Sequence, residues 1–323
     1  MMKAAHTSNH HSRIAIIGSG HVGATSAYAL LAGGFANEIV LLDANRRHVA
    51  GEAMDLQHAV PLARPARIWA GDYRDAAKAD IAVIAAGVSS RPGESRLDLL
   101  GRNVIVMREC VGQLMAEGFD GVLLMTTNPV DILAQVAQQE SGLPVERAIG
   151  SGTVLDTARL RQMVGEQLNV EARSVHAYIL GEHGDSEIAA WSCANIAGVP
   201  LREYCASAVC PDFDEVLRRV RRAAPDIIER KGYTSFAIAS CVTRICEAIL
   251  RDEHTVLPVS TLMRGQYGIK DVYLSTPCII GRIGVERVIE LPLDDGERAG
   301  LHASANILQH TLDGLRNAET HAA

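Results

Sequence analysis

The stretch Arg13-Ile14-Ala15-Ile16-Ile17-Gly18-Ser19-Gly20-His21-Val22-Gly23 decides the fold of this chain. Its leading residues are mostly apolar and end at a glycine, which is typical of a buried parallel strand. A helix-like segment, residues 24–32, follows, and then a second apolar run, residues 38–42, that ends at Asp43. Strand, Gly-x-Gly-x-x-Gly, helix, strand and acid together predict the first unit of a Rossmann-type, doubly wound parallel α/β sheet.

Each part of this unit has a physical purpose in binding a dinucleotide. Gly18 permits a tight turn, Gly20 lets a pyrophosphate approach the backbone, and Gly23 lets the helix pack on the strand. The helix N-terminus, which includes Val22, offers free N–H groups to phosphates. Asp43 follows Gly23 by 20 residues, where a carboxylate can accept hydrogen bonds from a ribose diol. Because it would repel the extra phosphate of NADP, NAD is the predicted cofactor.

The alternation of strands and helices continues along the first half of the chain. Residues 66–71, 80–87 and 121–127 are predicted strands, and residues 95–117 are a predicted helix. This order indicates a parallel sheet with right-handed crossovers. Ligands of such sheets bind at the carboxyl ends of the strands, so functional residues are expected just after them.

The second half predicts a different architecture. We expect helices over 155–168, 213–250 (interrupted near Pro225 and Gly232) and 294–315, and strands over 175–180, 187–192, 255–263, 272–280 and 285–290. Two domains are therefore expected. Residues 1–150 form the NAD-binding domain, with a disordered tail over 1–12, and residues 151–323 form a mixed α+β catalytic domain.

Composition limits the class of protein. The 323 residues are 48% hydrophobic and 21% charged, which indicates a soluble globular chain, and no apolar run is long enough for a membrane helix. The net charge of −7 argues against nucleic-acid binding. Seven cysteines without a CxxC pair, and no signal sequence, favour reduced thiols in the cytoplasm. His6, His10 and His11 could bind a metal, but a disordered tail is favoured, and we expect no metal site.

The loop Gly181-Glu182-His183-Gly184-Asp185-Ser186-Glu187 follows an apolar, strand-like run. A histidine at a strand end can exchange protons near neutral pH, although a single histidine is more often structural or merely exposed. Asp156 and Arg159 lie three residues apart and share one face of a predicted helix. Either they form a simple ion pair, or Asp156 orients His183 while Arg159 grips a substrate carboxylate.

Two further polar segments follow predicted strands. Gly87 and Gly93 bracket a segment with the composition of a lid. Beyond it, Arg96 either swings over a substrate or is a solvated arginine. Asn128 could bridge cofactor and substrate, although Asn-Pro more often only marks a turn.

These motifs resemble those of the L-lactate and malate dehydrogenase family in order and spacing. They are GSGHVG (18–23) with Asp43, GESRLDLL (93–100), TNPVD (127–131), LDTARLR (155–161) and GEHGDSE (181–187). The resemblance runs from about Ser12 to about Leu312. The segments KGYT (231–234) and YGIKDVY (267–273) are similar to the lactate branch of bacterial type.

The resemblance implies an NAD-dependent L-2-hydroxy-acid dehydrogenase and assigns roles to the polar residues. His183 is then the general acid/base, and Asp156 stabilises its imidazolium form. Arg159 anchors the substrate carboxylate, and Arg96 polarises the carbonyl group from the lid.

The resemblance also implies roles along the cofactor. Asn128 binds near the nicotinamide and the substrate oxygen, with a cis bond to Pro129. Thr234 lines the substrate pocket, and Ile238 packs against the nicotinamide. The rival interpretation is a nucleotide-binding regulator on a Rossmann scaffold. Such a protein has no reason to keep Asp156, Arg159 and His183 together.

The chain departs from the family at the specificity position of the lid. Lactate enzymes usually carry glutamine there and malate enzymes arginine, whereas this chain has Ser90, followed by Arg91. Serine leaves room for a larger 2-oxo acid and cannot pair with a second carboxylate, although Arg91 could turn inward and do so. We rank L-lactate first, a bulkier L-2-hydroxy acid second and malate third.

Two residues suggest regulation. Arg161 and His176 match the positions that bind fructose 1,6-bisphosphate between subunits of allosteric bacterial tetramers. Both side chains suit phosphate, and two facing copies would repel one another without it. The alternative is that they are ordinary interface or surface residues. A homotetramer is implied by the family alone.

Overall fold

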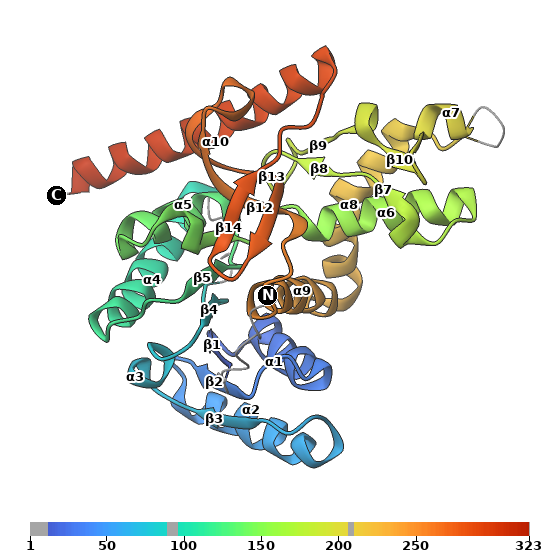
Figure 1. Cartoon of the computed structure of the whole chain (residues 1–323). Coiled ribbons are helices and arrows are strands. Elements are labelled where there is room, and N and C mark those ends of the chain that lie inside the picture. The colour runs from blue at the N-terminus through green and yellow to red at the C-terminus, as the bar shows by residue number, and fades with distance from the viewer. Residues whose placement is uncertain (1–11, 89–95, 206–209, 323) are drawn as a thin grey trace, which may run out of the picture.

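A nine-stranded sheet forms the centre of the computed structural model, which describes residues 12–88, 96–205 and 210–322 (Figure 1). Its order is β14-β13-β12-β6-β5-β4-β1-β2-β3. The six parallel strands come from the first half of the chain: β1 (Arg13–Ile17), β2 (Glu38–Leu42), β3 (Arg67–Ala70), β4 (Ile81–Ile84), β5 (Val122–Met125) and β6 (Ala148–Gly150). The predicted parallel α/β sheet is confirmed.

The second half of the chain extends this same sheet. Three antiparallel strands do so: β12 (Thr255–Arg264), β13 (Lys270–Gly281) and β14 (Gly284–Val288). Ser260 of β12 pairs antiparallel with Gly150 of β6, so the sheet crosses the predicted domain boundary. The antiparallel strands are confirmed, but the sequence did not indicate that they would join the parallel sheet.

The remaining strands are short. They are β7 (Val175–His176), β10 (Asn195–Ile196) and β11 (Val199–Pro200) in one small sheet, and β8 (Ile179–Leu180) and β9 (Ile188–Ala189) in another. The predicted strand over 175–180 is therefore split in two. The predicted strand over 187–192 yields only β9, because the chain turns into a 3-10 helix at 191–193.

Helices cover both faces of the sheet. They are α1 (His21–Gly33), α2 (Arg46–Ala59), α3 (Tyr73–Ala76), α4 (Arg96–Ala116), α5 (Val130–Ser141), α6 (Val154–Leu168), α7 (Leu201–Cys205), α8 (Phe213–Lys231), α9 (Phe236–Leu250) and α10 (Asp295–Ala322). Short 3-10 helices complete the described chain: η1 (Val60–Leu62), η2 (Val145–Arg147), η3 (Ala172–Ser174), η4 (Trp191–Cys193) and η5 (Gln266–Gly268).

The predicted break near Pro225 is wrong, because Pro225 lies inside the continuous helix α8. Proline removes one backbone donor and crowds the preceding turn, and helix α8 absorbs this cost. The break at Gly232 is confirmed, since Gly232 caps α8 with a left-handed φ of 89°.

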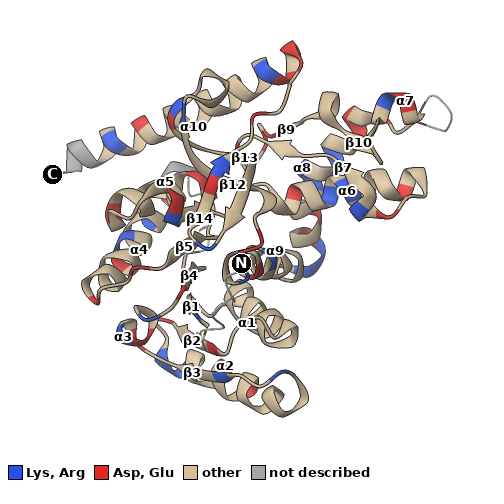
Figure 2. Ribbon diagram, viewed as in Figure 1, with Lys and Arg blue, Asp and Glu red and all other residues tan. Residues whose placement is uncertain are grey.

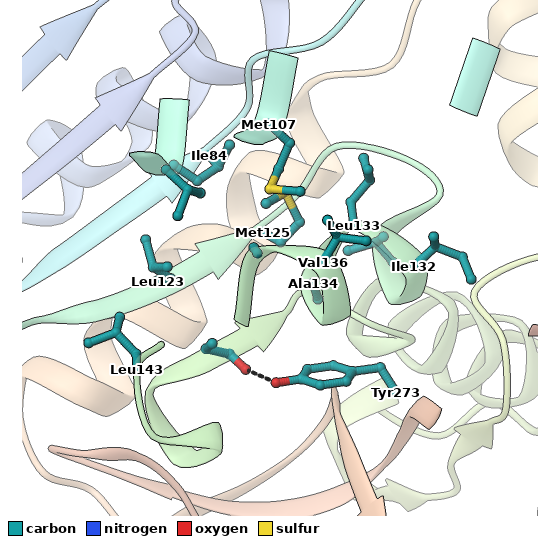
Figure 3. Packing of buried hydrophobic residues seen from close by; sticks show 14 of the residues in the cluster. Ile84, Met107, Leu123, Met125, Ile132, Leu133, Ala134, Val136, Leu143 and Tyr273 are labelled. Carbon is teal, nitrogen blue, oxygen red and sulfur yellow. Dashed lines mark hydrogen bonds between the residues drawn. The ribbon is translucent and has the colours of Figure 1, made fainter. Parts of the chain in front are cut away.

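The sheet is buried on both faces, which explains its continuous apolar strands. In β1, Ala15 and Ile17 join a core with α4, α5 and α10, whereas Ile14 and Ile16 join a core with α1 and α9. Figure 1 shows α4 and α5 on the side of the sheet opposite α1 and α9. Figure 3 shows part of the first of these cores, which contains Met107 of α4, Met125 of β5 and Leu133 of α5.

Charged residues of both signs are interspersed along α4, α6, α8 and α10 (Figure 2). Within the described residues, no helix is both long and apolar enough to cross a membrane. Residues 1–11, with His6, His10 and His11, lie outside the described residues, as does Ser90.

Tyr273 links the antiparallel strands to the parallel ones. Its side chain is 1% exposed, and its hydroxyl donates to the carbonyl oxygen of Ala148 in β6 at 2.9 Å (Figure 3). Its backbone N–H donates to Oε1 of Gln135 in α5 at 3.0 Å. One residue therefore fastens β13 to both a parallel strand and a covering helix.

We expect Tyr273→Phe to lower the free energy of unfolding by about 1–2 kcal/mol, because it leaves a buried carbonyl without this donor. Urea denaturation followed by circular dichroism measures the change. Tyr28→Phe in α1, where the side chain is 56% exposed, is the control. Equal stability of the two variants would contradict this role of the Tyr273 hydroxyl.

Candidate active site

The glycine-rich turn has the geometry that its sequence predicted. Gly18 has a φ of 98°, and a Cβ there would lie 2.4 Å from the backbone nitrogen of Ala86. A Cβ on Gly23 would lie 1.9 Å from the carbonyl oxygen of Gly18. At Gly20 a Cβ would meet no atom within 4 Å, so the backbone there faces open space at the N-terminus of α1. A phosphate can approach this point closely.

Asp43 lies at the carboxyl end of β2 and shapes the same turn. Its Oδ2 accepts from the backbone N–H of Ser19 at 2.8 Å, and its Oδ1 accepts from the backbone N–H of Asn45 at 2.8 Å. A cavity of about 540 Å³ opens beside it. Its lining includes Gly18, Gly20, Asp43, Tyr73, Val106 and Gln113. The open glycine backbone, the carboxylate and the apolar wall fit the predicted dinucleotide.

A second cavity, of about 110 Å³, lies between the two halves of the chain and gathers six of the predicted site residues. From the predicted set it is lined by Val22, Asn128, Arg159, His183, Thr234 and Ile238. Thr126, Ser151, Gly152, Leu155 and Ala224 complete the lining and were not predicted. Thr126, Ser151 and Gly152 directly follow β5 or β6, so the strand-end rule could have found them.

The Asn128–Pro129 peptide bond is cis, as the family resemblance implies. The carbonyl oxygen of Asn128 accepts from the Asn103 side chain of α4 at 3.4 Å. Because Pro129 directly precedes α5, the asparagine sits at the junction between β5 and that helix.

His183, Asp156 and Arg159 form one hydrogen-bonded group. Nδ1 of His183 lies 2.5 Å from Oδ2 of Asp156, and the Arg159 guanidinium donates to Oδ1 of Asp156 at 2.8 Å. Asp156 is 2% exposed, whereas the His183 side chain keeps 23% exposure toward the cavity. The Asp156 carboxylate therefore holds the His183 ring through Nδ1 and leaves Nε2 available to a ligand.

The first turn of α6 also fixes the strand that leads to His183. The hydroxyl of Thr157 accepts from the backbone N–H of Ile179 in β8 at 2.9 Å, and the hydroxyl of Thr153 donates to the carbonyl oxygen of Ile179 at 2.6 Å. At the loop, the backbone N–H of His183 donates to Oδ2 of Asp131 at 2.8 Å. Asp131 is a buried residue whose role sequence reasoning missed, because it lies 52 residues from His183.

Electrostatics favour a protonated His183. Burial acts to lower the pKa of His183, but the charge and hydrogen bond of Asp156 outweigh it and, with Asp131 and Glu187, raise the pKa to about 9. Burial also acts to raise the pKa of Asp156, yet His183 and Arg159 hold it below its ordinary value. The group therefore presents an imidazolium and a guanidinium to the cavity at neutral pH. It can bind an anion and give a proton to it.

Some predicted residues do not line this cavity, and others have side chains outside the described part of the structure. Arg96 is the first residue of α4, and only its backbone is described. Arg161 donates to the carbonyl oxygen of Ala177 at 3.0 Å and lies over the Tyr178 ring at 4.9 Å. His176 is exposed on β7. Arg161 and His176 both lie outside the linings of the two cavities.

Comparison with known proteins identifies relatives along nearly the whole chain. Residues 12–150 match the family model of the lactate/malate dehydrogenase NAD binding domain, and residues 153–318 match that of its alpha/beta C-terminal domain. The chain is 49% identical to an L-lactate dehydrogenase of Priestia megaterium over 93% of this chain and 96% of that protein. It is 46% identical to L-lactate dehydrogenase 1 of Clostridium acetobutylicum over 94% and 98% of the two chains.

Two solved structures of lactate dehydrogenases are similar to this chain along nearly its whole length. One is MGS-M5, a lactate dehydrogenase enzyme from a Medee basin deep-sea metagenome library, with a TM-score of 0.92 and 42% identity over 94% of this chain and 99% of that one. Another is the ligand-bound minor L-lactate dehydrogenase of Enterococcus mundtii, with a TM-score of 0.91 and 41% identity over 94% and 98%.

Proposed function

The chain belongs to the lactate/malate dehydrogenase family, and from this premise we propose that it interconverts L-lactate and pyruvate with His183 as the acid and base. It is an NAD-dependent oxidoreductase of the L-lactate dehydrogenase type. The observation that carries the proposed mechanism is the contact of His183 with Asp156 and of Asp156 with Arg159, beside one cavity.

We assign NAD binding to residues 1–150 and substrate binding to residues 151–323. Gly18, Gly20, Val22 and Gly23 would hold the pyrophosphate at the N-terminus of α1, and Asp43 would hold the adenosine ribose. Asn128 and Ile238 would hold the nicotinamide end, since both line the smaller cavity. NAD supplies the hydride acceptor or donor when it is bound.

The proton chemistry belongs to the chain itself. Arg159 binds the pyruvate carboxylate. In this orientation the carbonyl oxygen of pyruvate points toward the free ring nitrogen of His183. Protonated His183 gives its proton to that oxygen as the carbon is reduced, and neutral His183 takes it back in the reverse direction. Asp156 keeps the ring oriented and stabilises its charged form, because its carboxylate is buried against Nδ1.

Two further groups complete the proposed site. Asn128 and Arg96 stabilise the negative charge that develops on the carbonyl oxygen. Thr234 forms part of the wall of the substrate pocket, and its place in the lining of the smaller cavity supports this role. The predicted lid before α4 lies outside the described residues; in this proposal its closure would bring Arg96 to the substrate and exclude water. The seven free cysteines support a cytoplasmic location for this reaction.

We expect His183→Asn to lower kcat for pyruvate reduction by roughly 10²–10⁴-fold, because general acid and base help is lost. NADH binding, measured by fluorescence titration, should persist. The variant is compared with His302→Asn, which replaces a histidine of α10 outside both cavity linings. A near-normal rate in His183→Asn would exclude the assignment.

Ser90 carries the substrate preference in this proposal. A serine at the lid specificity position cannot pair with the second carboxylate of oxaloacetate, and Thr234 supports the lactate branch. The second candidate is an L-2-hydroxy acid with a larger side chain, which the small serine favours, and malate is third.

We expect kcat/KM for pyruvate to exceed that for oxaloacetate by at least about tenfold, because the second carboxylate lacks a matched cation. Steady-state rates with pyruvate, oxaloacetate and phenylpyruvate measure the ranking. A preference for phenylpyruvate would favour the bulkier substrate, and a preference for oxaloacetate would reverse the proposal.

We also propose a homotetramer in which Arg161 and His176 bind fructose 1,6-bisphosphate at a subunit interface. Arg161 hydrogen-bonds to the backbone of Ala177, the residue after His176, and His176 is exposed, which supports a shared phosphate site. Arg161 already contacts Ala177 and Tyr178, so a phosphate has to compete with these contacts.

Fructose 1,6-bisphosphate should raise pyruvate affinity by about fivefold or more at pH 7, the lower range of allosteric coupling. The KM for pyruvate, measured with and without the sugar bisphosphate, tests the change in affinity. Analytical ultracentrifugation under the same two conditions tests the assembly. His176→Ala should abolish the response. Unchanged affinity and unchanged assembly in the native enzyme would refute the effector site.

A further inference from the structure

Glu187 is a buried acid that the proposed mechanism does not use. It lies at the end of the histidine loop, directly before β9, and is 1% exposed. Its backbone N–H donates to the carbonyl oxygen of Gly184 at 3.3 Å, and its own carbonyl oxygen accepts from the Arg221 guanidinium of α8. The backbone is thus held on both sides, which fixes the direction in which the side chain leaves it.

The Glu187 carboxyl group lies against the catalytic group. One of its oxygens, a ring nitrogen of His183 and a carboxylate oxygen of Asp156 all lie within 4.8 Å of one another. Asp156 already accepts from both His183 and Arg159. Among the described residues, Oε1 of Glu187 has no hydrogen-bond partner. Glu187 is therefore a second carboxyl group beside an acid–base pair that is already complete.

Burial of an unpartnered carboxyl oxygen decides the charge state of Glu187. Protonated His183 and Arg159 carry two positive charges, which match Asp156 and the carboxylate of a bound substrate. An ionised Glu187 would add a buried negative charge to this balanced set, which costs free energy.

Arg221 of α8 adds a positive charge near Glu187, and Asp131 of α5 is a further buried acid beside His183, but burial of the Glu187 carboxyl group outweighs these charges. Burial, followed by the charge of Asp156, raises the pKa of Glu187 to about 9, although His183, Arg221 and Arg159 act to lower it. Burial likewise raises the pKa of Asp131. Glu187 and His183 thus lose their protons in the same alkaline range, as one interacting pair.

We propose that Glu187 is a neutral, protonated acid at neutral pH whose ionisation in alkaline solution keeps His183 protonated over a wider pH range. As pH rises, loss of the Glu187 proton leaves a negative charge beside the imidazolium, and this charge strengthens the hold of His183 on its own proton. Glu187 is a positioning residue, since it acts on the substrate only through His183. The inference rests on the proposed role of His183 as the acid.

Glu187→Gln tests this inference, because the amide keeps the shape of the neutral acid but cannot ionise. At pH 7 we expect kcat/KM for pyruvate to fall by at most about threefold. The alkaline rise in KM for pyruvate should begin about one pH unit lower than in the native enzyme, which is about a tenfold higher KM at a given alkaline pH. Glu166→Gln, at an exposed glutamate of α6, should follow the native profile.

Two outcomes would overturn the inference. One is a pH profile of Glu187→Gln that coincides with that of the native enzyme. The other is a loss of more than tenfold at pH 7, which would mean that the ionised form is required. Absence of pyruvate reduction in the native enzyme would instead remove the proposed function, so the two failures are distinguishable.

Infrared spectroscopy of the native enzyme gives a measurement that needs no variant. A protonated carboxyl band should be present at pH 7 and lose intensity with a midpoint near pH 9. If Glu187→Gln folds, it should lack this band, which distinguishes Glu187 from Asp131, the other buried acid with a raised pKa. Absence of any carboxyl band that titrates in the alkaline range contradicts the inference.

Discussion

The structure of the site depends on the contact between Asp156 and His183, which joins the first turn of α6 to a loop 27 residues away. The same turn of α6 holds β8 through Thr153 and Thr157. The helix that supplies the carboxylate therefore also positions the strand that carries the histidine. Because Asp156 is buried and its partners are fixed, its negative charge acts on the ring at close range and raises the pKa of His183.

The sheet determines where this group can act. Its strands are buried on both faces, so ligands reach the backbone only at the strand ends. The larger cavity lies at the ends of β1 and β2, and the smaller one adds residues that follow β5 and β6. β12 extends the sheet beyond β6, and α8 and α9 bring Ala224 and Ile238 to the smaller cavity. Residues from both halves of the chain therefore line the smaller cavity.

Local pattern predicted the elements with a clear period or clear boundary residues. The glycine turn, the parallel strands and the break at Gly232 are confirmed because each follows from backbone rules. Helix α5 was not predicted. Its residues 130–137 are all buried, and its polar residues Asp131 and Gln135 make buried hydrogen bonds to His183 and Asp271 instead of facing solvent. The break expected at Pro225 is absent, since surrounding structure holds α8 together through the proline.

The sequence by itself determined the class of fold, the family and the types of residue at the site, because strand–helix alternation and short motifs are local properties of the chain. It could not determine which buried acids surround His183. Asp131 reaches the histidine loop from 52 residues away, and Ser275 reaches Asp131 from 144 residues away. Only the tertiary structure brings these groups together in a region of low dielectric. There the distance between carboxyl groups, rather than their order in the chain, decides which of them is charged.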